Sequence, residues 1–366
     1  MQDRAQQTFD AGELAIVLSH YDLGIIESVT PFERGSRRSP KVGVVSQKGK
    51  FLLKRRDPER SSLTRIAFSH ALQAHLHAAG FPLPALVKPL DAPGPLFTLR
   101  EHVYELFEFV PGHAYRGTDA ETFDAGVTLA SFHQKVNGFK GDEPPALADY
   151  HDAMAVRTGL NSIPAQLSGH ESVTGREGEL YGVAQALFDT YDRAAEQADA
   201  AGLAYLEVGV VHSDWHPGNM LFRHERVAAV VDYDSVRLAR RALDVANGLL
   251  QFSIATEVRP EKWPDHLDEN RLLRFLGGYE SLRELAPAAK QCLVPLMVEA
   301  LIAECVVPIA ATGSFGRLQG FGFMKIVRRK VKWLTDHAAR LTALLTSASA
   351  PSPGGSPEFK VPSSGA

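Results

Sequence analysis

One short stretch of the chain concentrates side chains that could do chemistry. It consists of Val211-His212-Ser213-Asp214-Trp215-His216-Pro217-Gly218-Asn219, followed after a short hairpin by Val230-Val231-Asp232-Tyr233-Asp234. The two segments bring three carboxylates, two imidazoles and one carboxamide between apolar, strand-like runs. Charged groups in such surroundings need a partner, and the usual partner is a metal ion or a substrate. The stretch is therefore the first candidate for a functional site.

Two chemistries fit these residues. His212, Asp214 and His216 alternate, so a strand would place them on one face, where they would match the ligands of a transition-metal hydrolase. Phosphoryl transfer instead asks for positioning and for hard oxygen ligands to Mg²⁺. A carboxylate and a carboxamide on one loop, with a second carboxylate from a neighbouring strand, meet that need. The hydrolase leaves Asn219 and Asp232 without a use, but the residues alone leave both chemistries open.

The composition bounds the class of protein. The chain has 366 residues, of which 45% are hydrophobic and 22% charged, which is typical of soluble globular proteins and sufficient for two lobes. The formal net charge of -4 gives no general attraction to nucleic acid or anionic lipid, so neither nucleic acid nor a membrane is an expected partner. A small molecule bound at a local site is expected instead. The sequence carries no signal for a particular oligomeric state.

Cysteine usage and apolar patterning favour the cytoplasm. Cys292 and Cys305 lie in one apolar stretch, which fits buried thiols in a reducing compartment better than a disulfide framework. Residues 1–10 contain no apolar segment typical of a signal peptide. The most hydrophobic run, residues 293–311, is interrupted by two prolines and two glutamates, which favours a buried helix over a membrane span.

The first hundred residues have the pattern of a small sheet with two helices. A capping box at Asp10 and Glu13 predicts a first helix. Apolar alternation between turn residues then predicts strands at 26–32, 42–46, 51–54, 96–100 and 102–110, with a helix over 61–79. Lys54 lies on the third strand, on the same face as Leu52. The turn at residues 33–40 contains Gly35-Ser36 and could present backbone N–H groups to a phosphate, although a simple hairpin loop fits equally well.

The remainder of the chain is predicted to be mostly helical. Helices are expected at 118–136, 183–201, 240–254, 269–285, 288–311 and 319–345 from apolar spacing and helix caps. Residues 159–182 are rich in Gly, Ser and Thr and are predicted to form a surface excursion, which would be a flap or an insertion. The last helix is basic but carries an apolar packing stripe, so a solvated face is favoured over a nucleic-acid site.

The candidate stretch resembles a known signature. The pattern His212-x-Asp214-x-His216-x-x-Asn219, followed by a hydrophobic strand and Asp232-Tyr233-Asp234, resembles that of the aminoglycoside phosphotransferase and choline kinase family, relatives of the protein kinases. Lys54, the Gly35 turn and a linker at 107–112 occur in the matching order, and the resemblance covers residues 11–345. It implies an α+β, protein-kinase-like fold with a small antiparallel-sheet N-lobe (1–108), a larger helical C-lobe (109–346) and a disordered tail (347–366).

The resemblance also implies roles for individual residues and two cofactors, ATP and Mg²⁺. Asp214 would orient the acceptor hydroxyl and take its proton, and Asn219 and Asp232 would hold Mg²⁺. The nucleotide would be bound by the lysine on the third strand, by the glycine turn and by the linker, that is, by Lys54, Gly35, Ser36, Glu108, Phe109 and Val110. Supporting roles fall to His212, which would brace the loop, to His216, which would shape it, and to Asp234, as a metal ligand or its neighbour.

One departure and several alternatives remain at this point. The phosphate-binding lysine of this fold is usually paired with a glutamate of the first long helix, but residues 61–79 contain no Asp or Glu; Glu59 precedes them. A small-molecule phosphotransferase is favoured, with a Ser/Thr protein kinase of the bacterial stress-response type as the alternative and a nucleotide-binding module without catalysis as a third. The family's acceptors include amino sugars, choline, homoserine, methylthioribose and fructosamines. At least one of Glu299 and Glu304 is hypothesised to face the cleft and bind a cationic acceptor.

Overall fold

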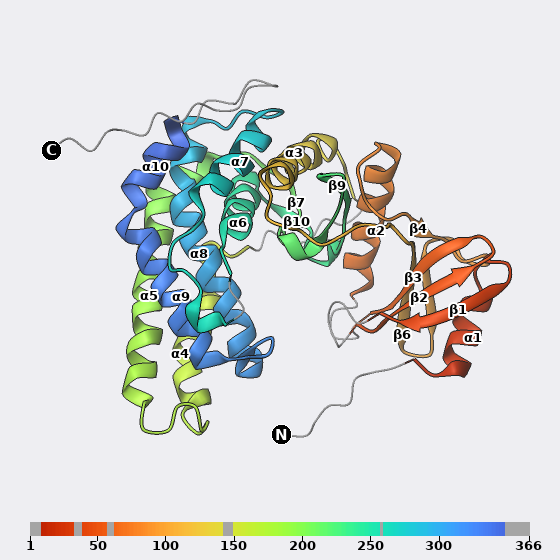
Figure 1. Ribbon diagram of the computed structural model, residues 1–366, viewed down its shortest axis with the longest axis horizontal. Coiled ribbons are helices and arrows are strands. Elements are labelled where there is room, and N and C mark those ends of the chain that lie inside the picture. The colour runs from red at the N-terminus through yellow and green to blue at the C-terminus, as the bar shows by residue number, and fades with distance from the viewer. Residues whose placement is uncertain (1–8, 33–38, 57–61, 142–148, 257–258, 348–366) are drawn as a thin grey trace. The chain divides into compact units, whose positions relative to one another are not determined.

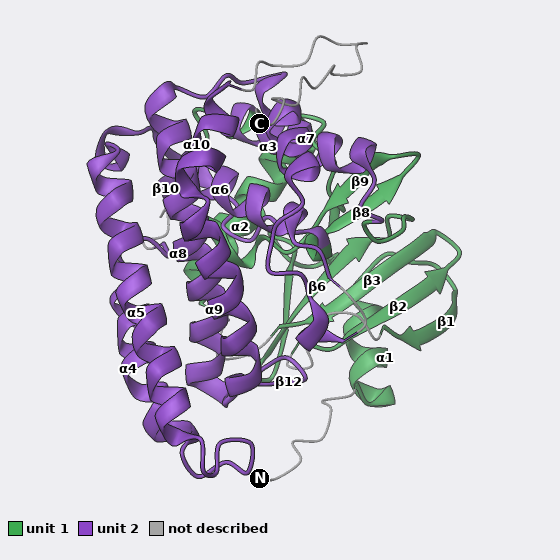
Figure 2. Ribbon diagram, turned by 60° about the vertical axis from the view of Figure 1, so that its left-hand side comes forward, with its two compact units in different colours: residues 1–115, 135–146, 218–237 green, residues 116–134, 147–217, 238–366 purple. Residues whose placement is uncertain are grey.

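The computed structural model describes residues 9–32, 39–56, 62–141, 149–256 and 259–347 (Figure 1). The chain forms two compact units (Figure 2). Unit 1 comprises Met1–Tyr115, Lys135–Ala146 and Gly218–Arg237, and unit 2 comprises Arg116–Gln134, Leu147–Pro217 and Leu238–Ala366. The Gly35-Ser36 turn, Glu59 and the tail from residue 348 lie outside the described residues. The lobe boundary after residue 108 stays a prediction.

Six of the described strands of unit 1 form one antiparallel sheet, as the sequence predicts. Its order is β1-β2-β3-β6-β4, with β5 also paired to β6. The strands are β1 (Ile26–Pro31), β2 (Lys41–Ser46), β3 (Gly49–Arg55), β4 (Leu86–Val87), β5 (Leu96–Leu99) and β6 (His102–Glu108). Alternation buries Val42, Val44 and Leu53 on one face, where they join a hydrophobic core with α1 (Ala11–Ser19). Because successive side chains of a strand point to opposite faces, the residues that reach this core are apolar at every second position.

Among its described residues, this unit contains the α-helices α1 and α2. α1 begins with the predicted capping box, in which the Glu13 N–H donates to the Asp10 carboxylate at 2.7 Å and the Asp10 N–H donates to Glu13 at 3.3 Å. α2 (Leu63–Ala78) buries residues at helical spacing, among them Ile66, Leu72 and Leu76. The helix predicted over 61–79 is therefore confirmed within its described part.

A short hairpin completes the described part of unit 1. β8 (Met220–Arg223) pairs with β9 (Arg226–Val230) in antiparallel register, with Met220 opposite Val230. The two turn residues, His224 and Glu225, have φ angles of 51° and 60°, because a two-residue turn that matches the strand twist needs left-handed backbone. The register places the residues just before β8 and just after β9 at the same open end of the hairpin.

Unit 2 is mostly helical, as predicted, and its helices pack around α8. Its elements are α3 (Asp119–Lys135), α4 (Met154–Leu167), α5 (Glu177–Ala200), β7 (Val208–Val211), β10 (Arg237–Arg240), α6 (Arg241–Ser253), α7 (Glu269–Glu280), α8 (Pro287–Thr312), β11 (Ser314–Phe315), β12 (Leu318–Gln319), α9 (Gly320–Asp336) and α10 (Ala338–Ser347). α8 contacts α4, α5, α6, α9 and α10. The single helix predicted over 319–345 is divided at His337.

The surface excursion predicted for residues 159–182 is wrong. Residues 154–167 form α4 and α5 already begins at Glu177, six residues before the predicted start. The glycine content of this stretch predicted a loop, but Gly159 lies where α4 approaches α8. A Cβ at this position would come within 2.7 Å of the Val306 side chain. Glycine at this position indicates close helix packing rather than a loop.

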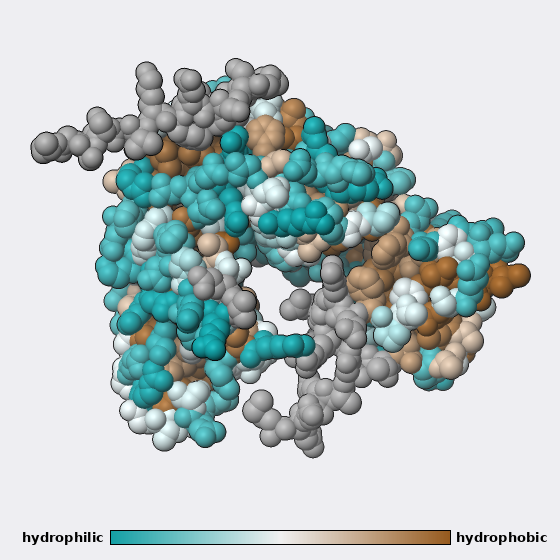
Figure 3. Space-filling view, in the orientation of Figure 1, coloured by the Kyte–Doolittle hydropathy of each residue, from teal (hydrophilic) through white to brown (hydrophobic). Residues whose placement is uncertain are grey.

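α8 has the length and apolar composition of a membrane-spanning helix, but it lies in the interior of unit 2. Its mean hydropathy over the most apolar window is 2.1, and 83% of that window is buried. Figure 3 shows mainly hydrophilic side chains over the helices of this unit on the face drawn. Both cysteines are free thiols buried in this helix, as predicted.

Candidate active site

The Asp214 loop begins directly after β7 in unit 2. The His212 side chain is fully buried, and its ring packs against Phe132 and Trp215, with centroids 6.1 and 5.5 Å away. Ser213 has a φ of 63°, a strained left-handed conformation for this residue type. The turn redirects the chain so that the next side chain, Asp214, is 39% exposed.

A buried carboxylate holds this turn in place. Asp244, in the first turn of α6, accepts hydrogen bonds from the backbone N–H groups of His212 at 2.7 Å and Ser213 at 2.8 Å. Burial raises its pKa, but the bond from His133 and the surrounding charges and N–H groups outweigh that effect and lower it. Asp244 therefore ties the Asp214 loop to helix α6.

His133 of α3 completes the support. Its Nε2 lies 3.3 Å from Asp244 and its Nδ1 lies 2.9 Å from the Tyr279 hydroxyl. Burial lowers the pKa of His133 despite the carboxylate beside it. A neutral ring that donates from Nε2 to Asp244 must accept from the Tyr279 O–H at Nδ1. His133 is thus a hydrogen-bonded core histidine.

The alternating residues of the loop do not share one environment. His216 is 34% exposed and its Nε2 lies 3.4 Å from the Asp214 carboxylate, whereas His212 is fully buried among aromatic rings. The single strand face that a transition-metal site would use is therefore not formed. In the described parts of the chain, no group of three or more His, Cys, Asp or Glu side chains could hold a metal ion.

Lys54 occupies a charged cluster in unit 1. Its Nζ lies 2.9 Å from Asp234 and 4.0 Å from Asp232, and its side chain is only 11% exposed. Burial lowers the pKa of Lys54, but the carboxylates, led by Asp234, raise it overall. Burial likewise opposes ionisation of Asp234, whose pKa the two neighbouring cations, Lys54 and Arg56, lower to about 2. Lys54 is therefore a charged, inward-facing lysine and not a solvated strand end.

Asn219 and Asp232 flank the open end of the β8-β9 hairpin. Asn219 immediately precedes β8, and its carbonyl accepts the N–H of Val231 at 2.9 Å, next to Asp232. Asn219 is buried, while Asp232 is 46% exposed and has a φ of 66°, which aspartate tolerates better than most residues. One carboxamide and one carboxylate offer hard oxygen ligands, which is the partial protein set that Mg²⁺ uses when phosphates complete its coordination. The donor set therefore fits a magnesium ion.

Three residues of the cluster around Lys54 were not predicted. Arg56 contacts both Asp234 and Glu105, and His70 contacts Glu105 from α2. A sequence signal existed for one of them: Glu105 is the single acidic residue among the apolar residues 103–107, and a charge inside a buried strand needs a partner. Its partners lie far away in sequence, so pairing could not be deduced from spacing.

The predicted adenine-binding residues lie at the end of β6 and directly after it. The Glu108 N–H donates to the Ala85 carbonyl and the Phe109 N–H donates to the Lys50 carbonyl, both at 2.9 Å. These two donors are engaged, so they cannot reach adenine as they stand. The roles of Glu108, Phe109 and Val110 stay predictions.

The two glutamates of α8 differ from each other. Glu299 is fully buried and contacts His151 at 3.0 Å and the Asp152 N–H at 3.0 Å, so it ties the start of α4 to α8. Glu304 is half-buried and accepts a hydrogen bond from Gln251 of α6. Burial and then the nearby Asp214 carboxylate raise the pKa of Glu304 to about 7. Only Glu304 belongs to the surroundings of Asp214.

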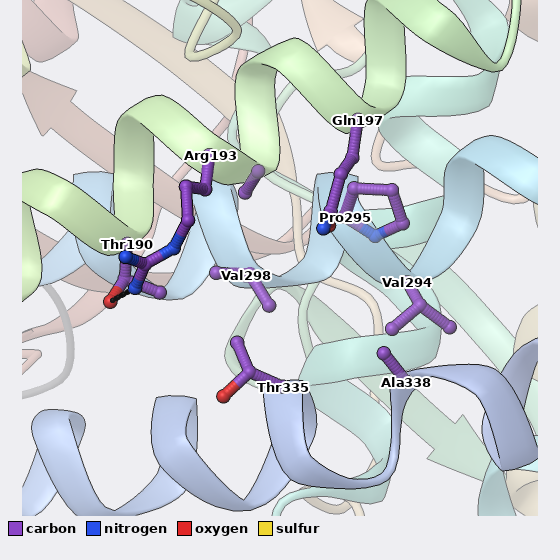
Figure 4. Close-up of a pocket in the computed structure, with 9 residues that line it drawn as sticks. Thr190, Arg193, Gln197, Val294, Pro295, Val298, Thr335 and Ala338 are labelled. Carbon is purple, nitrogen blue, oxygen red and sulfur yellow. Dashed lines mark hydrogen bonds between the residues drawn. The ribbon is translucent and has the colours of Figure 1, made fainter.

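A pocket elsewhere in unit 2 does not include these residues. It lies among α5, α8 and the α9–α10 junction, lined by Arg193, Gln197, Pro295, Val298 and Thr335 among others, with a volume of about 100 Å³ (Figure 4). None of the predicted site residues lines it. It is a gap in helix packing and plays no part in the site.

Comparisons with known proteins identify the family of this chain. The model of the phosphotransferase enzyme family matches residues 28–285, a range that contains Lys54, the Asp214 loop and Asp232. Homoserine kinase of Hyphomonas neptunium is 24% identical over 286 residues, which are 77% of this chain and 81% of that protein.

Solved structures share the fold at lower identity. A microcompartment-associated aminopropanol kinase has a TM-score of 0.68 at 16% identity, covering 92% of this chain and 100% of that one. An amicoumacin kinase in complex with AMP-PNP and Ca²⁺ has a TM-score of 0.66 at 14% identity, covering 90% and 94%. The α+β, protein-kinase-like fold is therefore confirmed.

Proposed function

The chain belongs to the phosphotransferase enzyme family, and we propose that it transfers the γ-phosphoryl group of ATP, with Mg²⁺, to a hydroxyl group of a small molecule. The observation that carries the proposal is the family match over residues 28–285, which spans Lys54, Asp214, Asn219 and Asp232. The amicoumacin kinase, which was solved with an ATP analogue and a divalent metal ion, supports the choice of cofactors.

Asp214 is the proposed catalytic base. Its carboxylate is half-exposed at the end of a loop that Asp244 fixes through two backbone hydrogen bonds, so it is both accessible and positioned. A carboxylate in this role orients the acceptor hydroxyl and takes its proton as the bond to phosphorus forms. His216, 3.4 Å from Asp214, orients that carboxylate, and His212 braces the loop from the core.

Lys54, Asn219 and Asp232 are the proposed ligands of the nucleotide and its metal ion. Asn219 and Asp232 would hold Mg²⁺, which neutralises charge on the phosphates when bound. Lys54 would bind the α- and β-phosphates, exchanging its contact with Asp234 for one with the nucleotide. Gly35 and Ser36, the proposed phosphate cover, lie outside the described residues, and Asp234 is assigned below.

We further propose that the acceptor carries an ammonium group beside its hydroxyl, as homoserine and aminopropanol do. The names of the relatives support this class, since they include a homoserine kinase and an aminopropanol kinase. Glu304 supports it physically, because a half-buried carboxylate next to Asp214 favours a cation. Glu299, the other glutamate of α8, is not assigned to the acceptor, because its carboxylate already contacts His151.

The test is product identification by mass spectrometry and ³¹P NMR after incubation with Mg-ATP and homoserine, aminopropanol, choline, an amino sugar and a generic protein substrate. A phosphate ester of a small amino alcohol is expected. Phosphorylation of the protein substrate alone would replace the small-molecule proposal by the protein kinase alternative. The acceptor class is tested by Glu304→Gln, which should raise the acceptor KM. Glu299→Gln is compared for its effect on folding, because Glu299 ties the start of α4 to α8. An unchanged acceptor KM in Glu304→Gln would contradict the role of Glu304.

A further inference from the structure

The carboxylate of Asp234 is shared by two cations of unit 1. Lys54 Nζ lies 2.9 Å from one of its oxygens and Arg56 Nη2 lies 2.6 Å from the other. The arginine side chain is only 5% exposed and that of Asp234 is 29% exposed. The pair is thus largely removed from water, where the loss of one partner has large consequences.

The other side of the Arg56 guanidinium is anchored in the sheet. Its Nη1 lies 2.5 Å from Glu105 Oε1 on β6, and the side chain of Glu105 is 1% exposed. Glu105 stands directly opposite Lys54 in the register of β3 and β6. A planar guanidinium can bridge two carboxylates in this way because its donors point in fixed directions, which an ammonium cannot reproduce.

Helix α2 joins the same network without an acidic residue. His70 Nε2 lies 2.6 Å from Glu105 Oε1, and the neighbouring Ser69 hydroxyl donates to the Tyr233 carbonyl at 3.1 Å. The helix therefore contacts both the strand that anchors Arg56 and the segment that carries Asp234. α2 thus contributes a histidine and a serine to this network, whereas the family resemblance leads one to expect a glutamate paired with the lysine.

Asp234 keeps a second cation beside it when Lys54 binds a phosphate. If Lys54 were its only cation, the carboxylate would compete with the nucleotide for the ammonium and would be left uncompensated after the exchange. Arg56 contacts a different oxygen of Asp234 from Lys54, and Glu105 holds its other side, so Arg56 can stay on Asp234 when Lys54 leaves. Because Arg56 still neutralises Asp234, the separation of Lys54 from this carboxylate costs less free energy.

We propose that Arg56, anchored by Glu105, is a positioning residue that keeps Asp234 in place and leaves the Lys54 ammonium available to nucleotide phosphates. The proposal rests on the proposed function through the role of Lys54. It assigns Asp234 to the support of Lys54 rather than to the metal ion. It also explains how the chain dispenses with a glutamate in α2.

The first test is Arg56→Gln, measured for ATP and acceptor kinetics. The KM for ATP, or the Kd for Mg-ADP by calorimetry, should rise at least ~10-fold while the acceptor KM stays unchanged, since charge-assisted contacts of this kind are worth at least that factor. Arg55→Gln is the matched control: Arg55 is a neighbouring, 7% exposed arginine paired with Glu13 at 2.7 Å, away from Asp234. It should lose stability without a change in nucleotide affinity.

A double variant separates positioning from folding. Arg56→Gln leaves Glu105 buried without its guanidinium, so a loss of stability is expected; Arg56→Gln with Glu105→Gln removes both charges and should regain part of that stability. The KM for ATP should nevertheless stay raised, because Asp234 still lacks its second cation. A KM that recovers together with stability would overturn the positioning role.

The outcomes also separate this inference from the proposed function. A wild-type enzyme that phosphorylates an acceptor while Arg56→Gln retains wild-type ATP KM would overturn the inference and leave the function standing. Wild-type protein that binds Mg-ADP but transfers no phosphoryl group would contradict the function, and the Mg-ADP affinity of Arg56→Gln would still decide the inference. Wild-type protein that binds no nucleotide would overturn both.

Discussion

The three acidic residues of the candidate site differ in their immediate surroundings. Asp214 is half-exposed beside His216, Asp232 is 46% exposed and 4.0 Å from Lys54, and Asp234 contacts two cations. These surroundings suit three tasks, namely proton transfer, metal binding and support of the phosphate-binding lysine. The residue types alone do not separate the tasks, because all three are carboxylates. The separation comes from their neighbours.

Glu304 gives a prediction of how stability depends on pH. Its pKa in the folded protein is about 7, raised from 4.5, so the folded state binds more protons than the unfolded state between these values. Stability must then fall as pH rises through this window, and the full cost of the buried charge is present above pH 7. Glu304→Gln should therefore stabilise the protein at pH 8, by on the order of 1 kcal/mol after allowing for partial exposure, and have little effect near pH 4.5.

Thermal unfolding of both proteins at the two pH values checks this prediction. The difference in Tm should be present at pH 8 and vanish at the lower pH. An equal effect at both pH values would mean that the substitution acts through packing and not through the carboxylate charge.

At the scale of elements, glycines decide how closely the helices of unit 2 approach one another. Gly278 of α7 lies against α3, where a Cβ would collide with the Phe123 carbonyl, and Gly126 of α3 faces α7 in the same way. α3 carries His133 and α7 carries Tyr279, which together hold Asp244. The close contact thus supports the residues that fix the Asp214 loop.

Gly278→Ala should destabilise the protein by ~1–3 kcal/mol or more, because the colliding atoms are backbone and cannot move aside easily. Gly182→Ala is the control, since Gly182 lies in α5 with open space around its Cβ position. That variant should be neutral or stabilising by up to ~1 kcal/mol through helix propensity. Chemical denaturation measures the free energy of unfolding of both variants. Equal changes in the two variants would contradict the prediction that the close α3–α7 contact makes Gly278 sensitive to substitution.

The sequence was sufficient for most elements and for the phosphotransferase family, whereas the roles of the site residues stay predictions; its failures have physical causes. Alternation predicted the strands of unit 1 because one face of the sheet is buried, and capping residues predicted α1. The stretch 159–182 was misjudged because glycine, a loop signal in isolation, serves helix packing at Gly159. The Arg56–Glu105–His70 network was missed because its members come from three elements whose pairing depends on strand register.

At the scale of the whole molecule, the nucleotide should stabilise the protein. The proposed ligands Lys54, Asn219 and Asp232 all belong to unit 1, although they come from segments far apart in sequence. A ligand that binds only the folded state at 100 times its Kd adds about 2.7 kcal/mol. A nonhydrolysable ATP analogue with Mg²⁺ should therefore raise Tm, and Lys54→Met should remove most of the shift.

Differential scanning calorimetry with and without Mg²⁺ measures this effect. Hydrogen exchange should show the added protection at β3 and at the open end of the β8-β9 hairpin, where Asn219 and Asp232 lie. Protection confined to unit 2, or a Tm that does not respond to saturating nucleotide, would contradict the assignment of the nucleotide ligands.

The most direct test of phosphoryl transfer to a hydroxyl through Asp214 is acceptor-dependent ADP release by wild-type protein and by Asp214→Asn. With Mg-ATP and an amino alcohol such as homoserine, the wild type should release ADP with phosphate ester formed in equal amount. The variant, which keeps the shape of the side chain but not its basicity, should turn over ~10²–10⁴-fold more slowly with little change in ATP KM. Equal turnover by the two proteins would contradict the account.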